Sequence, residues 1–241
     1  MSSKIRKTEL AEALKRQILT LELAPGSDLD ETELCERFAL SRTPVREVFR
    51  DLDGLGYLQM RAQRSPKVAD LSHVTLHNFF LAAPMIYGAV LRLAAGNARA
   101  AQIAALKSVQ LEFVAALRSG TAAERTLANY RFHEITGEMA GSVYLMPSFH
   151  RLLIDHARIG MTFYRPEAGG AAMDTSLASA QHDQIIEAIE TRDAERAAEL
   201  ADAHWALSRD QIGAFLMPEA LSQRLSEEMP FAATGTEGAR R

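Results

Sequence analysis

Three histidines in the second half of the chain occupy positions that suit metal binding. Asn129 and His133 are four residues apart in a helical stretch, so both side chains can point into the same space. His182 and His204 lie in two later helical stretches. Three imidazoles and one oxygen donor from three helices would form a first-row transition-metal site with positions left for water or a ligand.

The alternative for each histidine is a hydrogen-bonded core or surface residue, because spacing in sequence does not show that three helices meet. The remaining four histidines have no matching signal and are interpreted as surface or packing residues: His73, His77, His150 and His156.

A second group of residues suits DNA binding. Ser41 is a typical N-cap residue, and Pro44 falls in the first turn of the helix that follows, where a missing N–H does no harm. Arg42 and Arg46 are four residues apart and share a face. Arginine can bind guanine O6 and N7 with two hydrogen bonds, while Ser41 and Thr43 can bind phosphate or base edges.

The charge distribution agrees with this interpretation although the net charge of −4 does not. Residues 1–71 hold 12 basic and 12 acidic residues, and the remainder holds 15 and 19. Within residues 37–67, seven basic groups face three acidic ones, a net charge of +4. A solvated surface would also explain such a patch, but local rather than total charge governs phosphate contacts.

The elements around these residues predict a winged helix-turn-helix. Apolar spacing predicts a helix over residues 8–21, then a short helix capped by Asp30 or Thr32 that runs to Phe38, then the helix that begins at Ser41. Residues 57–60 and 66–69 are predicted to form two short strands, a small hairpin or wing.

After Leu71 strand signals vanish and alanine is abundant, which predicts an all-α bundle. The fold class is therefore mainly α, with a DNA-binding domain over residues 1–71, a helical domain over residues 72–217, and a flexible tail over residues 218–241. The six predicted helices of the bundle span residues 75–94, 98–119, 122–139, 142–163, 175–190 and 194–216. The lone Cys35 excludes an internal disulfide, and we expect a cytoplasmic protein with no membrane partner.

Three strings carry a family resemblance: LAPGSDLDETEL from Leu23, LSRTPVREVFRDL from Leu40, and GYL from Gly56. Together they resemble the winged helix-turn-helix of GntR-type bacterial transcription regulators. The all-helical remainder is similar to the FCD ligand-binding domain of the FadR branch, and its six helices are closest to the VanR-like subgroup.

The resemblance implies a homodimeric regulator, a repressor by expectation, that binds a palindromic double-stranded DNA operator and responds to a small organic acid. It implies a divalent transition metal (Zn, Ni or Mn), held at the positions Asn129, His133, His182 and His204. The DNA-contacting residues expected from the motif and the basic patch are Thr32, Ser41, Arg42, Thr43, Arg46, Arg50, Arg64 and Lys67.

Several positions depart from the family pattern. Ala39 stands where a glycine is common before the recognition helix, and Ser65-Pro66 replaces the glycine common near the wing tip. Ala83 and Tyr87 replace an Arg and a Glu of the first bundle helix. Because that Arg often helps to hold the effector's carboxylate, we expect Tyr87 to line the effector site, with Arg158 or Arg165 as substitutes for the lost cation.

Two other functions compete with a regulator. Three histidines in a helical bundle also suit a metal-dependent enzyme, but the bundle has no Glu-x-x-His pair and no positioned general base. An architectural DNA-binding protein without effector is the third hypothesis, and a helical domain of this size with a histidine cluster exceeds what that role needs.

Overall fold

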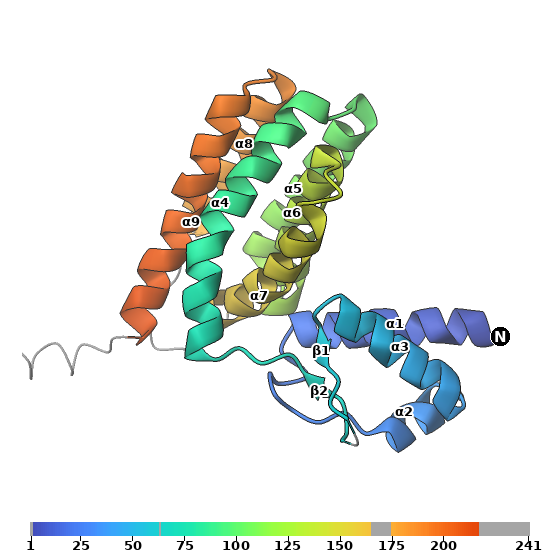
Figure 1. The fold of residues 1–241 in the computed structure, drawn as a ribbon. Coiled ribbons are helices and arrows are strands. Elements are labelled where there is room, and N and C mark those ends of the chain that lie inside the picture. The colour runs from blue at the N-terminus through green and yellow to red at the C-terminus, as the bar shows by residue number, and fades with distance from the viewer. Residues whose placement is uncertain (1, 63, 165–174, 217–241) are drawn as a thin grey trace, which may run out of the picture.

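The computed structural model describes residues 2–62, 64–164 and 175–216 (Figure 1). The N-terminal part contains α1 (Ser3–Leu19), α2 (Glu31–Arg37), α3 (Arg42–Gly54), β1 (Leu58–Gln59) and β2 (Lys67–Val68). The second part contains α4 (His73–Asn97), α5 (Ala100–Ser119), α6 (Ala122–Ala140), α7 (Met146–Tyr164), α8 (Thr175–Glu190) and α9 (Ala194–Leu216). The predicted fold class, a small winged helix-turn-helix followed by a helical bundle, is confirmed. The predicted tail falls outside the described residues.

Local capping explains where the first helices begin. The Asp30 carboxylate accepts hydrogen bonds from the backbone N–H groups of Thr32 (2.7 Å) and Glu33 (3.1 Å), so Asp30 rather than Thr32 caps α2. The Ser2 hydroxyl caps α1 and starts it at Ser3, five residues before the predicted start. Ser41 caps α3 by position only, because its hydroxyl makes no capping hydrogen bond and stays exposed.

The turn between α2 and α3 is strained at one residue. Ala39 has φ +49°, in the left-handed region, where an L-residue costs about 1–2 kcal/mol relative to its right-handed conformation. A glycine, which is common at this position in the family, would adopt this conformation without strain. The turn holds because the backbone N–H of Leu40 donates to the Cys35 carbonyl at 3.0 Å and Leu40 is buried in the core.

The wing is an antiparallel pair of strands shorter than predicted. Leu58 pairs with Val68 and Gln59 with Lys67, and each strand has only two residues. Leu58, Val68 and Pro66 are buried, Gln59 and Lys67 are half-buried, and the described residues nearer the tip are exposed: Met60, Arg61, Ala62, Arg64 and Ser65. The apolar pair Leu58 and Val68 therefore fixes the hairpin to the domain, and Arg61 and Arg64 near its tip are exposed to solvent.

In the second part, α4 packs against α9 and α6, and α5 packs against α6 and α8 (Figure 1). By length and composition α4 and α5 could also cross a membrane, but core helices of soluble proteins pass the same test. The α6 helix ends at Gly141, which adopts a left-handed conformation (φ +62°). A turn follows, and α7 therefore begins at Met146, four residues after its predicted start.

Helix α7 belongs to two cores at once. Its residues Phe149 and Leu153 pack in the core of the bundle, whereas Ile154 and Ala157 pack with the core of the DNA-binding domain. The Arg151 guanidinium also donates to the Gly56 carbonyl at 2.7 Å. This helix is thus the main structural connection between the two halves of the chain.

Candidate functional site

The predicted DNA-binding residues gather on the first turns of α3 and around it. Ser41 is exposed at the N-cap of α3, Arg42, Thr43, Arg46 and Arg50 are exposed on α3, and Thr32 is exposed on α2. Arg64 is exposed at the wing. Lys67 is only half-buried, but its ammonium lies 3.3 Å from an Asp28 oxygen and donates to the Gly26 carbonyl, so it is turned toward the protein.

Glu31 is the residue of this surface that sequence reasoning missed. One of its carboxylate oxygens accepts a hydrogen bond from Arg46 Nε at 2.8 Å, and the other lies 3.6 Å from Arg42 Nε. The hydrogen bond to Glu31 raises the pKa of Arg46. Because Arg46 uses Nε for this contact, both terminal amino groups of its guanidinium remain available for a base. The charge count over residues 37–67 left Glu31 out.

The three predicted histidines meet inside the bundle. His133 comes from α6, His182 from α8 and His204 from α9, and one ligand nitrogen from each lies within 4.8 Å of the others. Their exposed fractions are 1%, 0% and 6%. Asn129 lies one helical turn before His133 on α6 and is buried as well.

Two glutamines set the orientation of two of these rings. Gln110 donates from its amide nitrogen to the Ser179 carbonyl at 3.1 Å and to Asp183 at 3.0 Å. Its amide oxygen therefore faces His182 Nδ1 at 3.0 Å and accepts a hydrogen bond from the Nδ1–H group. The Nε2 lone pair of His182 is left free, which is the tautomer that a metal ligand needs. His204 Nδ1 lies in the same way 2.8 Å from Gln181 Oε1.

Burial keeps these imidazoles neutral. Desolvation lowers the pKa of His133 and His182 well below 6.5, and it lowers the pKa of His204 to about 4. Among the described residues, neither ring nitrogen of His133 has a hydrogen-bond partner, and neither has His182 Nε2. Such orphaned nitrogens are costly in a protein interior unless something binds them. The donor set therefore fits a transition-metal ion.

His156, predicted as a surface or packing residue, packs beside the three-histidine cluster. It is 6% exposed on α7, its ring centroid lies 4.8 Å from that of His133, and burial lowers its pKa to about 3. Its Nδ1 lies 3.2 Å from the hydroxyl of Tyr87, which is also buried beside His133. Phe149, Leu153 and His156 are spaced by four and three residues, a signal that could have placed His156 in the core.

Arg158 does not join the histidines. Its fully buried guanidinium is paired with Asp155 and donates to the carbonyls of Ala69 and Asp70 in the segment that connects the two halves. The prediction of Arg158 as an effector-binding cation is therefore replaced by a structural role at this connection. Arg165, the other predicted substitute, lies outside the described residues.

Both the N-terminal and the C-terminal part of the chain match known protein families. Residues 6–68 match the family described as "Bacterial regulatory proteins, gntR family", and residues 84–207 match the FCD domain. The chain is similar to the HTH-type transcriptional repressor RspR of Escherichia coli K12, with 38% identity over 87 residues. That match spans 36% of this chain and only 38% of the repressor's length.

Longer matches cover most of the chain. The probable D-xylose utilization operon transcriptional repressor of Paenarthrobacter nicotinovorans is 26% identical over 204 residues, which cover 81% of this chain and 85% of that one. Among solved structures, E. coli McbR/YncC superposes with a TM-score of 0.72 and 17% identity, covering 90% of this chain and 98% of that one. The curated relatives are named as transcriptional repressors and the matched family as regulatory proteins, so the enzyme hypothesis is not supported. The chain belongs to the gntR family of bacterial transcription regulators and combines its DNA-binding domain with an FCD domain.

Proposed function

We propose that this regulator is a cytoplasmic, ligand-responsive repressor that binds a palindromic operator as a homodimer. Its effector is a small organic acid whose binding is assisted by a metal ion in the bundle. The observation that carries the proposal is the convergence of three buried, neutral histidines in a domain joined to a DNA-binding module. Two of them, His133 and His182, have ring nitrogens without a hydrogen-bond partner among the described residues. The repressor names of the relatives support the sign of regulation.

On DNA, the N-terminal turn of α3 would enter the major groove. Arg42 and Arg46 would bind base edges, Ser41 and Thr43 would bind phosphates or base edges, and the wing would lie over the neighbouring backbone with Arg64. Because a large share of such affinity comes from phosphate contacts, binding should weaken steeply with salt.

In the bundle, His133, His182 and His204 would hold a divalent Zn, Ni or Mn ion, with Asn129 supplying an oxygen. The three imidazoles already lie close enough for their ligand nitrogens to be within 4.8 Å of one another. The ion would supply a Lewis-acidic position for a carboxylate oxygen. The Tyr87 hydroxyl and His156 lie beside His133 and bond to each other through His156 Nδ1, so one of them, either the Tyr87 hydroxyl or His156 Nε2, can donate a hydrogen bond to the rest of such a ligand.

Helix α7 contacts both the histidine cluster and the DNA-binding domain, so a change at the cluster can alter the position of that domain. His156 lies next to His133, and Ile154 and Ala157 of the same helix pack in the DNA-binding domain. A ligand changes operator affinity only if it binds one arrangement of the two domains more tightly than the other.

The test is an anisotropy titration on the DNA upstream of the regulator's own gene, with chelated and metal-loaded protein and a panel of organic acids. We expect tight binding that at least one acid weakens only when metal is present. The variant His133→Ala/His182→Ala should lose bound metal and the acid response. The control His73→Ala/His77→Ala changes two exposed histidines and should keep both. Equal metal content in the two variants would reject the site.

A further inference from the structure

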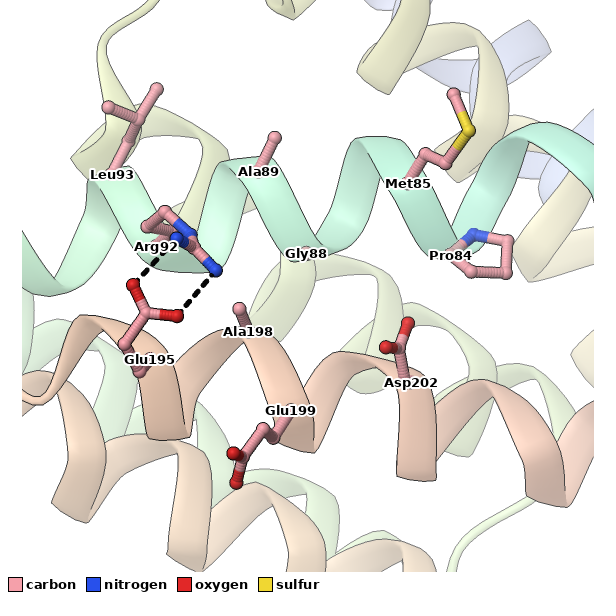
Figure 2. Close-up of a pocket in the computed structure, with 10 residues that line it drawn as sticks. All are labelled: Pro84, Met85, Gly88, Ala89, Arg92, Leu93, Glu195, Ala198, Glu199 and Asp202. Atoms are coloured by element: carbon pink, nitrogen blue, oxygen red, sulfur yellow. Dashed lines mark hydrogen bonds and ion pairs between the residues drawn. The ribbon is translucent and has the colours of Figure 1, made fainter.

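A hollow of about 630 Å³ lies on the outer face of the bundle between α4 and α9 (Figure 2). Among the described residues that line it, Arg92 is the one cation, and its guanidinium is paired with Glu195 at 2.6 and 2.8 Å. Glu199 and Asp202 also line the hollow, so carboxylates outnumber the cation and would repel an organic acid. A response to an acid therefore starts at the three-histidine cluster and has to travel from there to the DNA-binding domain.

Helix α6 carries two of the expected ligands and also contacts the DNA-binding domain. Asn129 and His133 lie one turn apart on it, and Tyr130 lies between them in sequence. Tyr130 packs against the core of the bundle and also against the core of the DNA-binding domain. Leu127, three residues earlier on α6, packs against the core of the DNA-binding domain as well. The helix that presents the ligands is therefore in direct contact with the domain that binds DNA.

A hydrogen bond joins the two parts of the chain at this contact. The hydroxyls of Tyr57 and Tyr130 lie 3.1 Å apart, although the two residues are separated by 73 positions in sequence. Burial raises the pKa of Tyr57 to about 12 and also raises the pKa of Tyr130, so both hydroxyls keep their protons at neutral pH. This hydroxyl pair is thus a neutral hydrogen bond whose length depends on how the two domains are arranged.

Tyr57 connects the hydroxyl pair to the elements that face DNA. Its backbone N–H donates to the Leu52 carbonyl of α3 at 2.9 Å, and its carbonyl accepts from the Ala69 N–H at 2.9 Å, directly after β2. The next residue, Leu58, begins β1 of the wing. Because Tyr57 is only 5% exposed, its ring is held by its neighbours and cannot move without them. A displacement of this ring therefore reaches both the recognition helix and the wing.

We propose that Tyr57 and Tyr130 are positioning residues that convey occupancy of the metal site to the DNA-binding domain. This inference rests on the metal site of the proposed function and adds the contact through which that site acts. A ligand bound by Asn129 and His133 fixes α6 relative to the helices of the other two histidines, and the hydroxyl pair follows α6. Coupling requires an element whose equilibrium both sites influence, and the hydroxyl pair belongs to both. Helix α7 supplies none of the expected ligands and contacts the cluster only beside it, through His156.

Isosteric variants separate this role from a purely structural one. Tyr57→Phe or Tyr130→Phe leaves one hydroxyl without its partner and should lower the stability of the fold. The double variant leaves no unpaired hydroxyl and should recover most of that loss. The coupling should not recover, because none of the three variants can form the bond. Tyr164→Phe removes a hydroxyl from another buried tyrosine, at the end of α7, and is the matched control.

The measured quantity is the ratio of the operator dissociation constants of the Zn²⁺-loaded and the chelated full-length protein, obtained by fluorescence anisotropy. A coupling between two sites typically changes affinity by about 5–150-fold. We expect the native chain and Tyr164→Phe to give the same ratio. Each single variant and the double variant should bring the ratio closer to one by the same factor, about 2–10-fold, which is the worth of one hydrogen bond. Circular dichroism and thermal unfolding verify the fold of each variant.

The possible outcomes distinguish this inference from the function on which it rests. An unchanged ratio in the variants, or effects of the two single changes that add up in the double variant, overturns the role of the hydroxyl pair while the metal site stands. Operator affinities that shift equally with and without Zn²⁺ overturn it too, because the bond is then only structural. A native ratio of one also overturns the inference. If the panel of organic acids leaves operator binding unchanged as well, the ligand response of the proposed function is refuted with it.

Discussion

Acid should destabilise the metal-free protein through its buried histidines. Burial lowers the pKa of His156 to about 3 and of His204 to about 4, whereas an unfolded histidine titrates near 6.5. Below pH 6.5 the histidines of the unfolded state are protonated while the buried histidines of the folded state stay neutral. Because the unfolded state binds more protons, the free energy of unfolding falls as the pH falls. The stability is fully present above pH 6.5 and declines progressively until the pH reaches the folded pKa values.

The expected magnitude follows from the distance between the pH and 6.5. At pH 5 each of these two histidines costs about 2 kcal/mol, since one pKa unit corresponds to about 1.4 kcal/mol. His156 and His204 together should remove about 4 kcal/mol between pH 7.5 and pH 5, and the lowered pKa values of His133 and His182 add to this loss. That is a large part of the 5–15 kcal/mol by which proteins of this kind are stable.

The assay is urea unfolding with a chelator present at pH 7.5, 6 and 5. The only tryptophan, Trp205, packs against His156 and Tyr87 and reports the unfolding of this core by its fluorescence. Replacing His204 with Phe should reduce the loss between pH 7.5 and 5 by about 2 kcal/mol. The exposed control His77→Gln should leave it unchanged. A flat profile, or equal pH dependence in the native chain and His204→Phe, would refute the reasoning.

Three further predictions concern the connection and the DNA surface. Arg158→Met leaves buried Asp155 with only its 3.5 Å contact to Arg151 and should lower the free energy of unfolding by about 3–5 kcal/mol, which thermal denaturation would detect. The double variant Arg158→Met/Asp155→Leu should recover part of this loss. Arg46→Ala should weaken operator binding, measured by fluorescence anisotropy, by about 1–3 kcal/mol. If the variant weakens binding to random DNA by the same amount, Arg46 does not contact a base. Glu31→Gln should free Arg42 and Arg46, so operator binding falls while binding to random DNA rises; a parallel fall in both would mean only a folding defect.

The sequence predicts helices and motifs well where the determinants are local. Asp30, Ser41 and Gly141 end or begin helices through bonds and dihedral angles within a few residues, so the order of elements follows from the pattern. The family resemblance supports the expected metal positions Asn129, His133, His182 and His204, whose convergence spacing alone leaves open. Local patterns do not tell which distant helices pack together.

The missed residues all act through contacts between segments far apart in the chain. Glu31 meets Arg46 across the turn between α2 and α3, and His156 meets Tyr87 across 69 residues. Arg158 carries a charge that local reasoning assigns to a ligand, but its partners lie 88 and 89 residues earlier in the connecting segment. Such pairs require the packing of α7 against both halves, which no short window of sequence contains.

The double membership of α7 sets a condition on engineering. A hybrid regulator made by joining residues 1–71 to a foreign sensor domain would leave Gly56, Ala69 and Asp70 without the arginines that satisfy their carbonyls. It would also expose apolar surface that Ile154 and Ala157 cover in the native chain. An exchangeable module should therefore carry the α7 surface with it, grafted onto the corresponding helix of the recipient.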